Sequence, residues 1–137
     1  MASFVLTNAW VRINAVDLSD HVREVAVDTS QEDVETTTMG ATGKTRTPGL
    51  RDDKFVLTLA SDFASSKVDQ TLWPLFNGGS SFLVEVAAAG TAISATNPKY
   101  HGTVILTEWS PVGGKIGDFA EVPVTLPVSG TISRATA

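Results

Sequence analysis

The stretch DKFVLTLA, residues 53–60, alternates between large apolar and mostly smaller or polar side chains. Phe55, Leu57 and Leu59 fall on one side of this alternation, and Lys54 falls on the other. A period of two places successive side chains on opposite faces of a β-strand. The stretch therefore predicts a strand with one face in a hydrophobic core and the other face in a different environment.

The same period recurs along most of the chain. Strands are predicted over residues 9–16, 22–29, 81–87, 102–109 and 119–126. Turn-forming pairs such as Asn97-Pro98, Gly113-Gly114 and Ser129-Gly130 separate or follow them. Many short alternating runs with turns between them predict a mainly β fold of the sandwich or barrel type.

Residues 62–77, DFASSKVDQTLWPLFN, break the strand pattern with apolar residues at helical spacing. Asp62 or Ser65 could cap the start of a helix, and Gly78-Gly79 would end it. Pro74 would strain or end the helix near Leu72. The segment predicts one short helix, lying across a sheet, with an irregular last turn.

Residues 30–52 show neither period and form a segment longer than most connections in a compact domain. The acidic residues Glu32, Asp33 and Glu35 come first, and the basic residues Lys44, Arg46 and Arg51 follow. One interpretation is a solvated hairpin whose two arms neutralise each other. The other is an arm that docks onto a neighbouring copy, acidic side to basic side. The candidate residues for such contacts are Glu32, Asp33, Glu35, Met39, Lys44, Arg46 and Arg51.

Length and composition indicate a single domain over residues 1–137. The chain is 42% hydrophobic and 18% charged, carries a net charge of −5, and contains no cysteine. This composition supports a folded core, and the lack of cysteine excludes disulfides and thiolate metal sites. The negative net charge argues against binding to the phosphates of nucleic acid. Residues 1–11 contain no Lys or Arg, and no apolar run approaches a bilayer span of about 20 residues. We therefore expect a protein made in the cytoplasm, without membrane insertion.

No set of residues assembles a catalytic site, so we do not expect an enzyme and expect no cofactor or metal. Gly43-Lys44-Thr45 resembles the end of a P-loop, but Thr38 stands where that motif needs its first glycine. Asp17, Asp20 and His21 are expected to form a local turn rather than a metal site.

The remaining polar and aromatic candidates are expected to serve the structure. The adjacent Asp52 and Asp53 should point to opposite faces, and His101 is expected to be a partly exposed structural residue. Tryptophans are expected as core or interface anchors: Trp10, Trp73 and Trp109.

The order of these segments resembles a known family. A strand is followed by the VDLSDHV turn, a second strand, a Thr- and Gly-rich loop through ETTTMG, then PGLRD and a strand. The helical segment and the run ATNPKYHGTVILTEWSPVGGKIGDFAEVPVTLPVSG follow. This text is similar to the major tail tube protein of long-tailed bacteriophages, over residues 8–137.

The resemblance implies a β-sandwich-like barrel with one helix and a long inter-subunit loop. It implies six-membered rings that stack into a hollow tube, and a protein located in the tail of the virion. The implied partners are further copies of the chain, a tape measure protein inside the tube, tail terminator and tail tip proteins, and DNA that passes through without specific binding.

An inner sheet that lines the channel is also implied by the resemblance. We expect this sheet to contain the strands that start near Val22, Asp53, Gly102 and Phe119, with the channel side opposite their apolar faces. This predicts the lumen-lining residues Glu24, Asp28, Lys54, Thr58, Glu108, Glu121 and Thr125. Four carboxylates and one lysine would give the wall about −3 charges per subunit, which favours passage of DNA over binding.

Other classes of protein remain open at the level of sequence. A β-sandwich binding or capsid-decoration module would expose Trp10 and Trp109 on one face. A small β-barrel enzyme would need converging titratable groups. The tube protein of a related injection machine would share the architecture and carry an effector instead of a genome.

Overall fold

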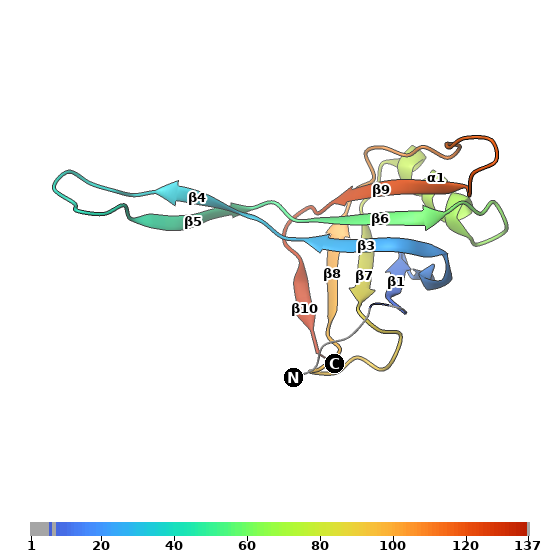
Figure 1. Cartoon of the computed structure of the whole chain (residues 1–137), viewed down its shortest axis with the longest axis horizontal. Helices are drawn as coiled ribbons and strands as arrows, with labels where there is room; N and C mark the ends of the chain where they lie inside the picture. The colour runs from blue at the N-terminus through green and yellow to red at the C-terminus, as the bar shows by residue number, and fades with distance from the viewer. Residues whose placement is uncertain (1–5, 7, 137) are drawn as a thin grey trace.

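The computed structural model describes residues 6 and 8–136, which form a two-layered β body with a long projecting ribbon (Figure 1). Its helices and strands follow the chain as β1 (Trp10–Ile13), β2 (Val16–Asp17), the 3-10 turn η1 (Ser19–His21), β3 (Val22–Asp28), β4 (Gln31–Glu35), β5 (Arg46–Arg51), β6 (Lys54–Ala60), α1 (Val68–Gly78), β7 (Phe82–Ala87), β8 (Lys99–Val104), β9 (Glu121–Pro127) and β10 (Ser133–Ala135). The mainly β fold with one α-helix predicted from the sequence is confirmed.

Two antiparallel sheets make the body. One has five strands in the order β10-β8-β7-β1-β2, and the other has three in the order β3-β6-β9. The strands of the three-stranded sheet run across those of the five-stranded sheet (Figure 1). The core lies between the two layers because each strand presents its alternate apolar residues inward.

The stretch 53–60 occupies the centre of the three-stranded sheet, as β6. Phe55, Leu57 and Leu59 are fully buried, and each lies opposite an apolar residue of β9. Those partners are Leu126, Val124 and Val122. The five-stranded sheet, the helix and the segments next to them complete the core with Val11, Ile13, Leu18, Val68, Leu72, Phe82, Val84, Val86, Val104, Leu106 and Ile132.

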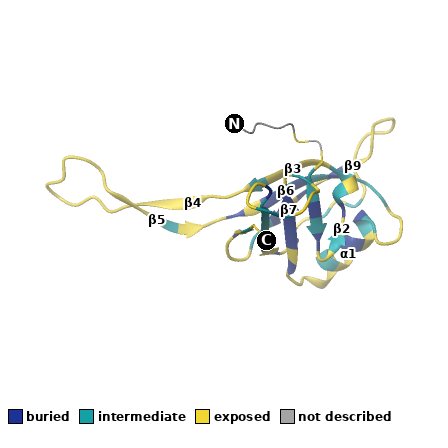
Figure 2. Ribbon diagram, turned by 90° about the horizontal axis from the view of Figure 1, so that it is seen from below, coloured by how far each residue is buried: buried dark blue, intermediate teal, exposed yellow. Residues whose placement is uncertain are grey.

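Residues 30–52 form a β-hairpin of β4 and β5, which agrees with the hairpin interpretation of this segment. It continues from the ends of β3 and β6 and extends well beyond the body, with almost every residue exposed (Figure 2). These strands show no alternation of apolar and polar residues in the sequence, because neither face of the ribbon is buried in one subunit.

Two predicted strands have different boundaries. The strand expected over 9–16 is a hairpin, since Asn14 and Ala15 adopt positive φ values of 49° and 67° between β1 and β2. The strand expected over 102–109 starts earlier, at Lys99, and ends at Val104. Leu106 is buried without belonging to a strand, which explains why the pattern continued in the sequence.

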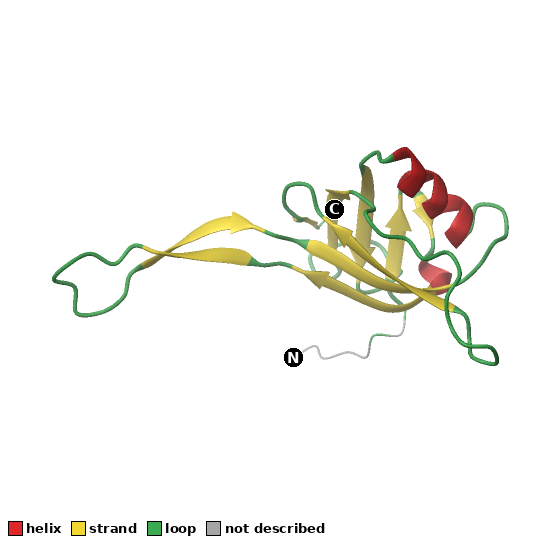
Figure 3. Ribbon diagram, turned by 90° about the horizontal axis from the view of Figure 1, so that it is seen from above, coloured by secondary structure: helices red, strands yellow, loops and turns green. Residues whose placement is uncertain are grey.

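The helix is shorter at its start than predicted and longer at its end (Figure 3). It begins at Val68, because Ser66 has a φ of 61° and interrupts any helix from Asp62. Pro74 lies inside the helix, which continues to Gly78 and is closed by Gly79 in the left-handed conformation. Leu75 and Phe76 pack against the core beyond the proline and hold the last turn in place.

Candidate functional site

The outer face of the three-stranded sheet collects most of the predicted channel residues. Residues opposite one another in adjacent strands share a face, and the register pairs Glu24 with Thr58 and Asp28 with Lys54. Glu121 and Thr125 lie opposite Ala60 and Val56 of β6, on the same face. Six of the seven predicted residues therefore share one surface: Glu24, Asp28, Lys54, Thr58, Glu121 and Thr125.

Glu108 is the exception, because its predicted place in the same sheet as the other six residues was wrong. The strand that begins at Lys99 pairs with β7 and β10 in the five-stranded sheet, so it does not belong to the sheet of β3, β6 and β9. Glu108 lies after this strand, in an exposed segment without regular structure. The sequence pattern could not reveal this, because alternation predicts a strand without naming its neighbours.

The outer face is also less negative than the sequence suggested. Without Glu108 the predicted residues on this face comprise three carboxylates and one lysine, or −2 per subunit instead of −3. Arg23, at the bulge of β3, places Nη1 3.4 Å from Glu121 Oε2 and its guanidinium 4.5 Å from the centroid of the Phe119 ring. Arg23 was missed because a bulge removes it from the alternation.

Ion pairs within the hairpin join its acidic arm to its basic arm. Arg46 Nη1 lies 2.9 Å from Asp33 Oδ2, and Lys44 Nζ lies 3.5 Å from Glu35 Oε1. These contacts are those of a hairpin whose arms neutralise each other. The pairing leaves the hairpin close to neutral, and docking of its charged arms onto a neighbouring copy stays a prediction.

The tip of the hairpin, residues 36–45, is exposed and nearly uncharged. Thr36 N donates to Thr45 O at 2.8 Å, and Thr45 N donates to Thr37 Oγ1 at 2.9 Å. Met39 is fully exposed at the turn. The tip thus presents a flexible apolar side chain at the far end of an ordered ribbon.

A buried carboxylate fixes the base of the hairpin. Asp53 is completely buried and accepts hydrogen bonds from Ser30 N at 3.3 Å and Ile132 N at 2.8 Å. Arg51 Nη2 lies 2.7 Å from Asp53 Oδ2. One side chain thus joins both strands of the hairpin base to the C-terminal segment. The prediction that Asp52 and Asp53 point to opposite faces agrees with the exposure of Asp52, but the anchoring role could not be read from the sequence.

His21 bridges two carboxylates beside the start of β3. Its Nδ1 lies 2.7 Å from Asp20 Oδ1, and its Nε2 lies 2.7 Å from Asp62 Oδ2. Burial alone lowers the pKa of His21, but the hydrogen bonds to Asp62 and Asp20 outweigh it and raise the pKa above its ordinary value of 6.5.

Both carboxylates of this cluster are correspondingly stabilised in their charged forms. The hydrogen bond from Ala64 N, and then the bond from His21, lower the pKa of Asp62, while the bond from His21 lowers the pKa of Asp20. The expected local turn is also present, because Asp17 accepts from Ser19 N at 2.9 Å. The long-range partner Asp62 was not predicted.

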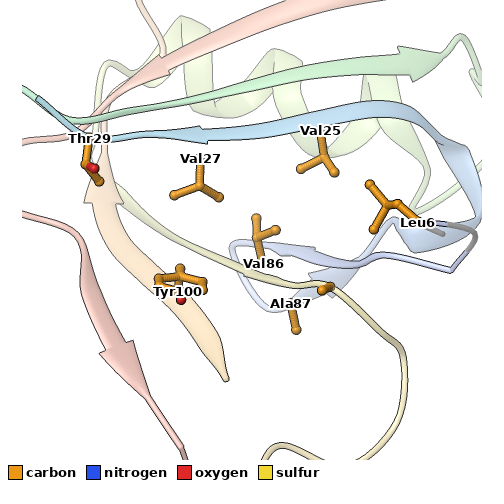
Figure 4. Close-up of a pocket in the computed structure, with 8 residues that line it drawn as sticks. Leu6, Val25, Val27, Thr29, Val86, Ala87 and Tyr100 are labelled. Carbon is orange, nitrogen blue, oxygen red and sulfur yellow. The ribbon is translucent and has the colours of Figure 1, made fainter. Parts of the chain in front are cut away.

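An apolar groove of about 460 Å³ opens between the two sheets beside β3 (Figure 4). Its lining side chains come from β3, β7, β8 and the N-terminal segment: Leu6, Val25, Val27, Thr29, Val86, Ala87, Ala88 and Tyr100. Val25 and Val27 point into it from the edge of the three-stranded sheet (Figure 4). The groove marks the side of the sandwich where the layers are not closed by the described residues.

The end of the body opposite the hairpin exposes several large apolar side chains. They lie on two adjacent loops, which are joined where Ser61 N donates to Ala120 O at 3.1 Å. We call them the distal patch: Phe63, Val112, Ile116 and Phe119. Of the tryptophans, Trp73 is exposed and lies 5.9 Å from the Phe76 ring, whereas Trp10 and Trp109 are half-buried.

The described ranges contain no group of three or more His, Asp or Glu side chains placed to hold a metal ion. Within those same ranges, no helix is both long and apolar enough to cross a membrane.

Comparison of the sequence with known families and with curated proteins gives no match. Comparison of the fold gives strong matches. A chain of the virion of a native gene transfer agent particle aligns with a TM-score of 0.76 and 14% identity, covering 97% of this chain and 99% of that one. A chain from the tail of an empty gene transfer agent particle, which has C6 symmetry, aligns with a TM-score of 0.67 and 17% identity, over 85% and 83%. The protein therefore shares its fold with virion and tail proteins, which confirms in structure the resemblance to a tail protein.

Proposed function

We propose that this chain is a structural protein of a phage-like tail, and that it forms six-membered rings that stack into a tube. The observation that carries the proposal is the fold match over nearly the full length of both this chain and a virion protein. The C6 symmetry of the second neighbour supports rings of six. A sheet with two open edges is suited to such a ring, because a closed ring leaves no edge unpaired.

The shape of the subunit supports stacking along its long axis. The hairpin projects from one end of the body, and the two loops that carry the distal patch, between β6 and α1 and between β8 and β9, lie at the other end (Figure 1). A two-stranded ribbon without a covered face is marginally stable in water. The hairpin exposes Val34, Met39 and Leu50, so contact with another subunit would cover apolar surface at both ends. Such a head-to-tail contact propagates without limit.

The outer face of the three-stranded sheet is the proposed wall of the channel. Its excess of carboxylates would repel a DNA backbone weakly and would offer no cluster of cations for phosphates to bind. We further propose that DNA passes through this channel, that a tape measure protein occupies it before DNA does, and that tail terminator and tip proteins close its ends. The proposed role is structural and assigns the chain no catalytic step.

Electron microscopy of the concentrated protein tests the proposal. The wild-type chain is expected to form rings and tubes, whereas deletion of residues 35–46 should leave a folded domain that forms rings without stacking. Met39→Ser should shorten tubes, and Thr38→Ser, an equally exposed neighbour, should not. A wild-type chain that stays monomeric by sedimentation at every concentration and salt would overturn the proposal, and long tubes from the deletion variant would overturn the role of the hairpin.

A further inference from the structure

The two edge strands of the three-stranded sheet, β3 and β9, differ in which side chains accompany their outward-pointing backbone groups. Two flanking bonds fix the alternation of the ladder: Asp52 N donates to Ser30 O, and Val128 N donates to Asp53 O. Since bonded pairs recur every second residue, the even-numbered residues of β3 and of β9 bond to β6. The odd-numbered residues of both edge strands therefore direct their N–H and C=O groups away from the sheet.

The side chains of these outward-bonding residues lie on different faces. On β3 they are Val25 and Val27, whose side chains point toward the core side and line the groove (Figure 4). On β9 they are Glu121, Pro123 and Thr125, whose side chains lie on the exposed outer face. Among the described residues, a backbone group without a hydrogen-bond partner thus accompanies a core-facing side chain at the β3 edge and an outward-facing side chain at the β9 edge.

We infer that in the ring the β9 strand of one copy lies parallel to the β3 strand of the next, over the groove. This inference rests on the proposed six-membered ring. Rotation about one axis keeps the outer face of every copy on the same side of the ring. It also preserves strand direction, and β3 and β9 point the same way because each is antiparallel to β6.

The hydrogen-bonding pattern of the two edge strands also favours a parallel pair of β3 and β9, and this argument does not use the symmetry of the ring. In an antiparallel pair, residues opposite each other both turn their backbone groups inward and their side chains to one face. Val25 opposite Pro123 would violate this, because their side chains belong to different faces. In a parallel pair, a bonding residue faces one whose own groups point away, so Val25 can face Val122, another core-side residue.

Prolines make the two edges chemically different. Pro123 and Pro127 have no N–H, and the carbonyl of Pro127 already accepts from Ile105 N at 3.2 Å. The open part of the β9 edge is therefore rich in acceptors, while Val25 and Val27 of β3, and Thr29 just after it, supply donors. Loss of donors also discourages pairing of two β9 edges, which favours closure with β3 of another copy.

We call the proposed contact between β9 of one copy and β3 of the next the seam. Pairs of introduced cysteines can report its direction, because the chain has no native cysteine. Within one copy β6 separates β3 from β9, so the distance of about 10 Å prevents an internal disulfide between them. In assembled rings, a parallel seam predicts cross-linking of E24C/E121C together with D28C/T125C. An antiparallel seam predicts E24C/T125C together with D28C/E121C. Pairs shifted by two residues along β9 test the register.

In a parallel seam, the two residue numbers of every cross-linked pair differ by the same amount, as in E24C/E121C and D28C/T125C. We expect only such pairs to give a ladder of covalent oligomers, up to six chains, on a denaturing gel. Rings that cross-link only through the crossed pairs, or through none, would overturn the seam. Failure to form rings without oxidation would instead overturn the proposed function.

A matched set of variants tests the same seam without cross-linking. Val27→Pro removes an outward N–H and should lower the assembled fraction at least tenfold while the monomer stays folded. Val27→Ala keeps the N–H and should assemble substantially better than Val27→Pro. Equal assembly of these two variants would contradict the role of this donor.

Discussion

At the scale of single residues, Asp53 joins three parts of the chain through one buried carboxylate. It receives the N–H groups of Ser30 and Ile132 and the guanidinium of Arg51. Burial of an ionised group is costly unless every lone pair is used, and here the partners come from both sides of the hairpin base and from the C-terminal segment. The carboxylate therefore couples the direction of the hairpin to the body.

Substitution of Asp53 should destabilise the subunit in proportion to the partners lost. Asp53→Ala leaves the buried N–H group of Ile132, the partly buried N–H group of Ser30 and a partly buried guanidinium unpaired, and should lower the free energy of unfolding by about 3–4 kcal/mol. Asp53→Asn keeps an acceptor and should cost about 1–2 kcal/mol. Urea denaturation measures both. Asp52→Ala, at the exposed neighbour, is the control, and an equal loss for Asp52 and Asp53 would contradict the anchor.

The cluster of His21, Asp20 and Asp62 should make the stability of the fold depend on pH in two ranges, above about pH 6.5 and below about pH 3.8. Its raised pKa means that the charged imidazole stabilises the fold fully below pH 6.5, and that this contribution is lost as the pH rises through the pKa of the folded state. The lowered pKa values of Asp20 and Asp62 act in the opposite direction, because their contribution is present above about pH 3.8 and is lost on acidification.

Denaturation of the wild type and of His21→Gln across pH 3–9 measures this dependence. The difference in stability between the two should be largest between about pH 4 and 6.5 and should shrink on both sides. Asp62→Asn should move the midpoint of the His21 titration, observed by NMR, to lower pH. A midpoint unchanged by Asp62→Asn would show that the bridge does not form in solution.

At the scale of elements, α1 keeps its last turn despite an internal proline. Pro74 removes the N–H that would bond to the carbonyl of Gln70, and its ring crowds that carbonyl. Since Pro74 is exposed, Pro74→Ala should raise the free energy of unfolding by about 1 kcal/mol or more, observed as a higher Tm. Gln70→Ala, at another exposed position, should change it by only a few tenths of a kcal/mol. A lower Tm for Pro74→Ala would mean that the proline ring itself contributes to packing.

At the scale of the whole molecule, the sign of the outer sheet face should decide whether a tube holds DNA. Glu24, Asp28, Glu121 and Lys54 give −2 per subunit, and changing the three carboxylates to Lys gives +4. The altered tube should bind short duplex DNA, and its affinity should fall steeply between 50 and 200 mM salt. Fluorescence anisotropy with assembled tubes measures this binding, and the wild-type tube should give none.

The matched control places the same change of charge elsewhere on the subunit. Glu32, Glu108 and Asp118 lie off the three-stranded sheet, so replacing them with Lys should add much less binding inside the tube. Equal binding by both triple variants would show that the outer face of this sheet does not line the channel.

The sequence was enough to predict most strands of the body, apart from β10, and the faces of the residues in the three-stranded sheet. Alternation is a local property, and Phe55, Leu57 and Leu59 point to the core because neighbouring side chains on a strand must diverge. The same geometry placed Glu24, Asp28 and Thr125 on the opposite face. The mainly β class and the order of segments likewise followed from local signals, because turns and strand patterns need no distant partner to be recognised.

Only the tertiary structure decided which strands become neighbours. Pairing between residues far apart in the chain places β8 in the five-stranded sheet and joins β4 to β5 within residues 30–52. It also brings the hydrogen-bond partners to Asp53. The phase of the β3 and β9 edges depends on such pairing as well, because the bonds to β6 determine which backbone groups stay free. Alternation assigns a face to every side chain, but hydrogen bonding across the sheet assigns the edges, and that information lies in the partner strand.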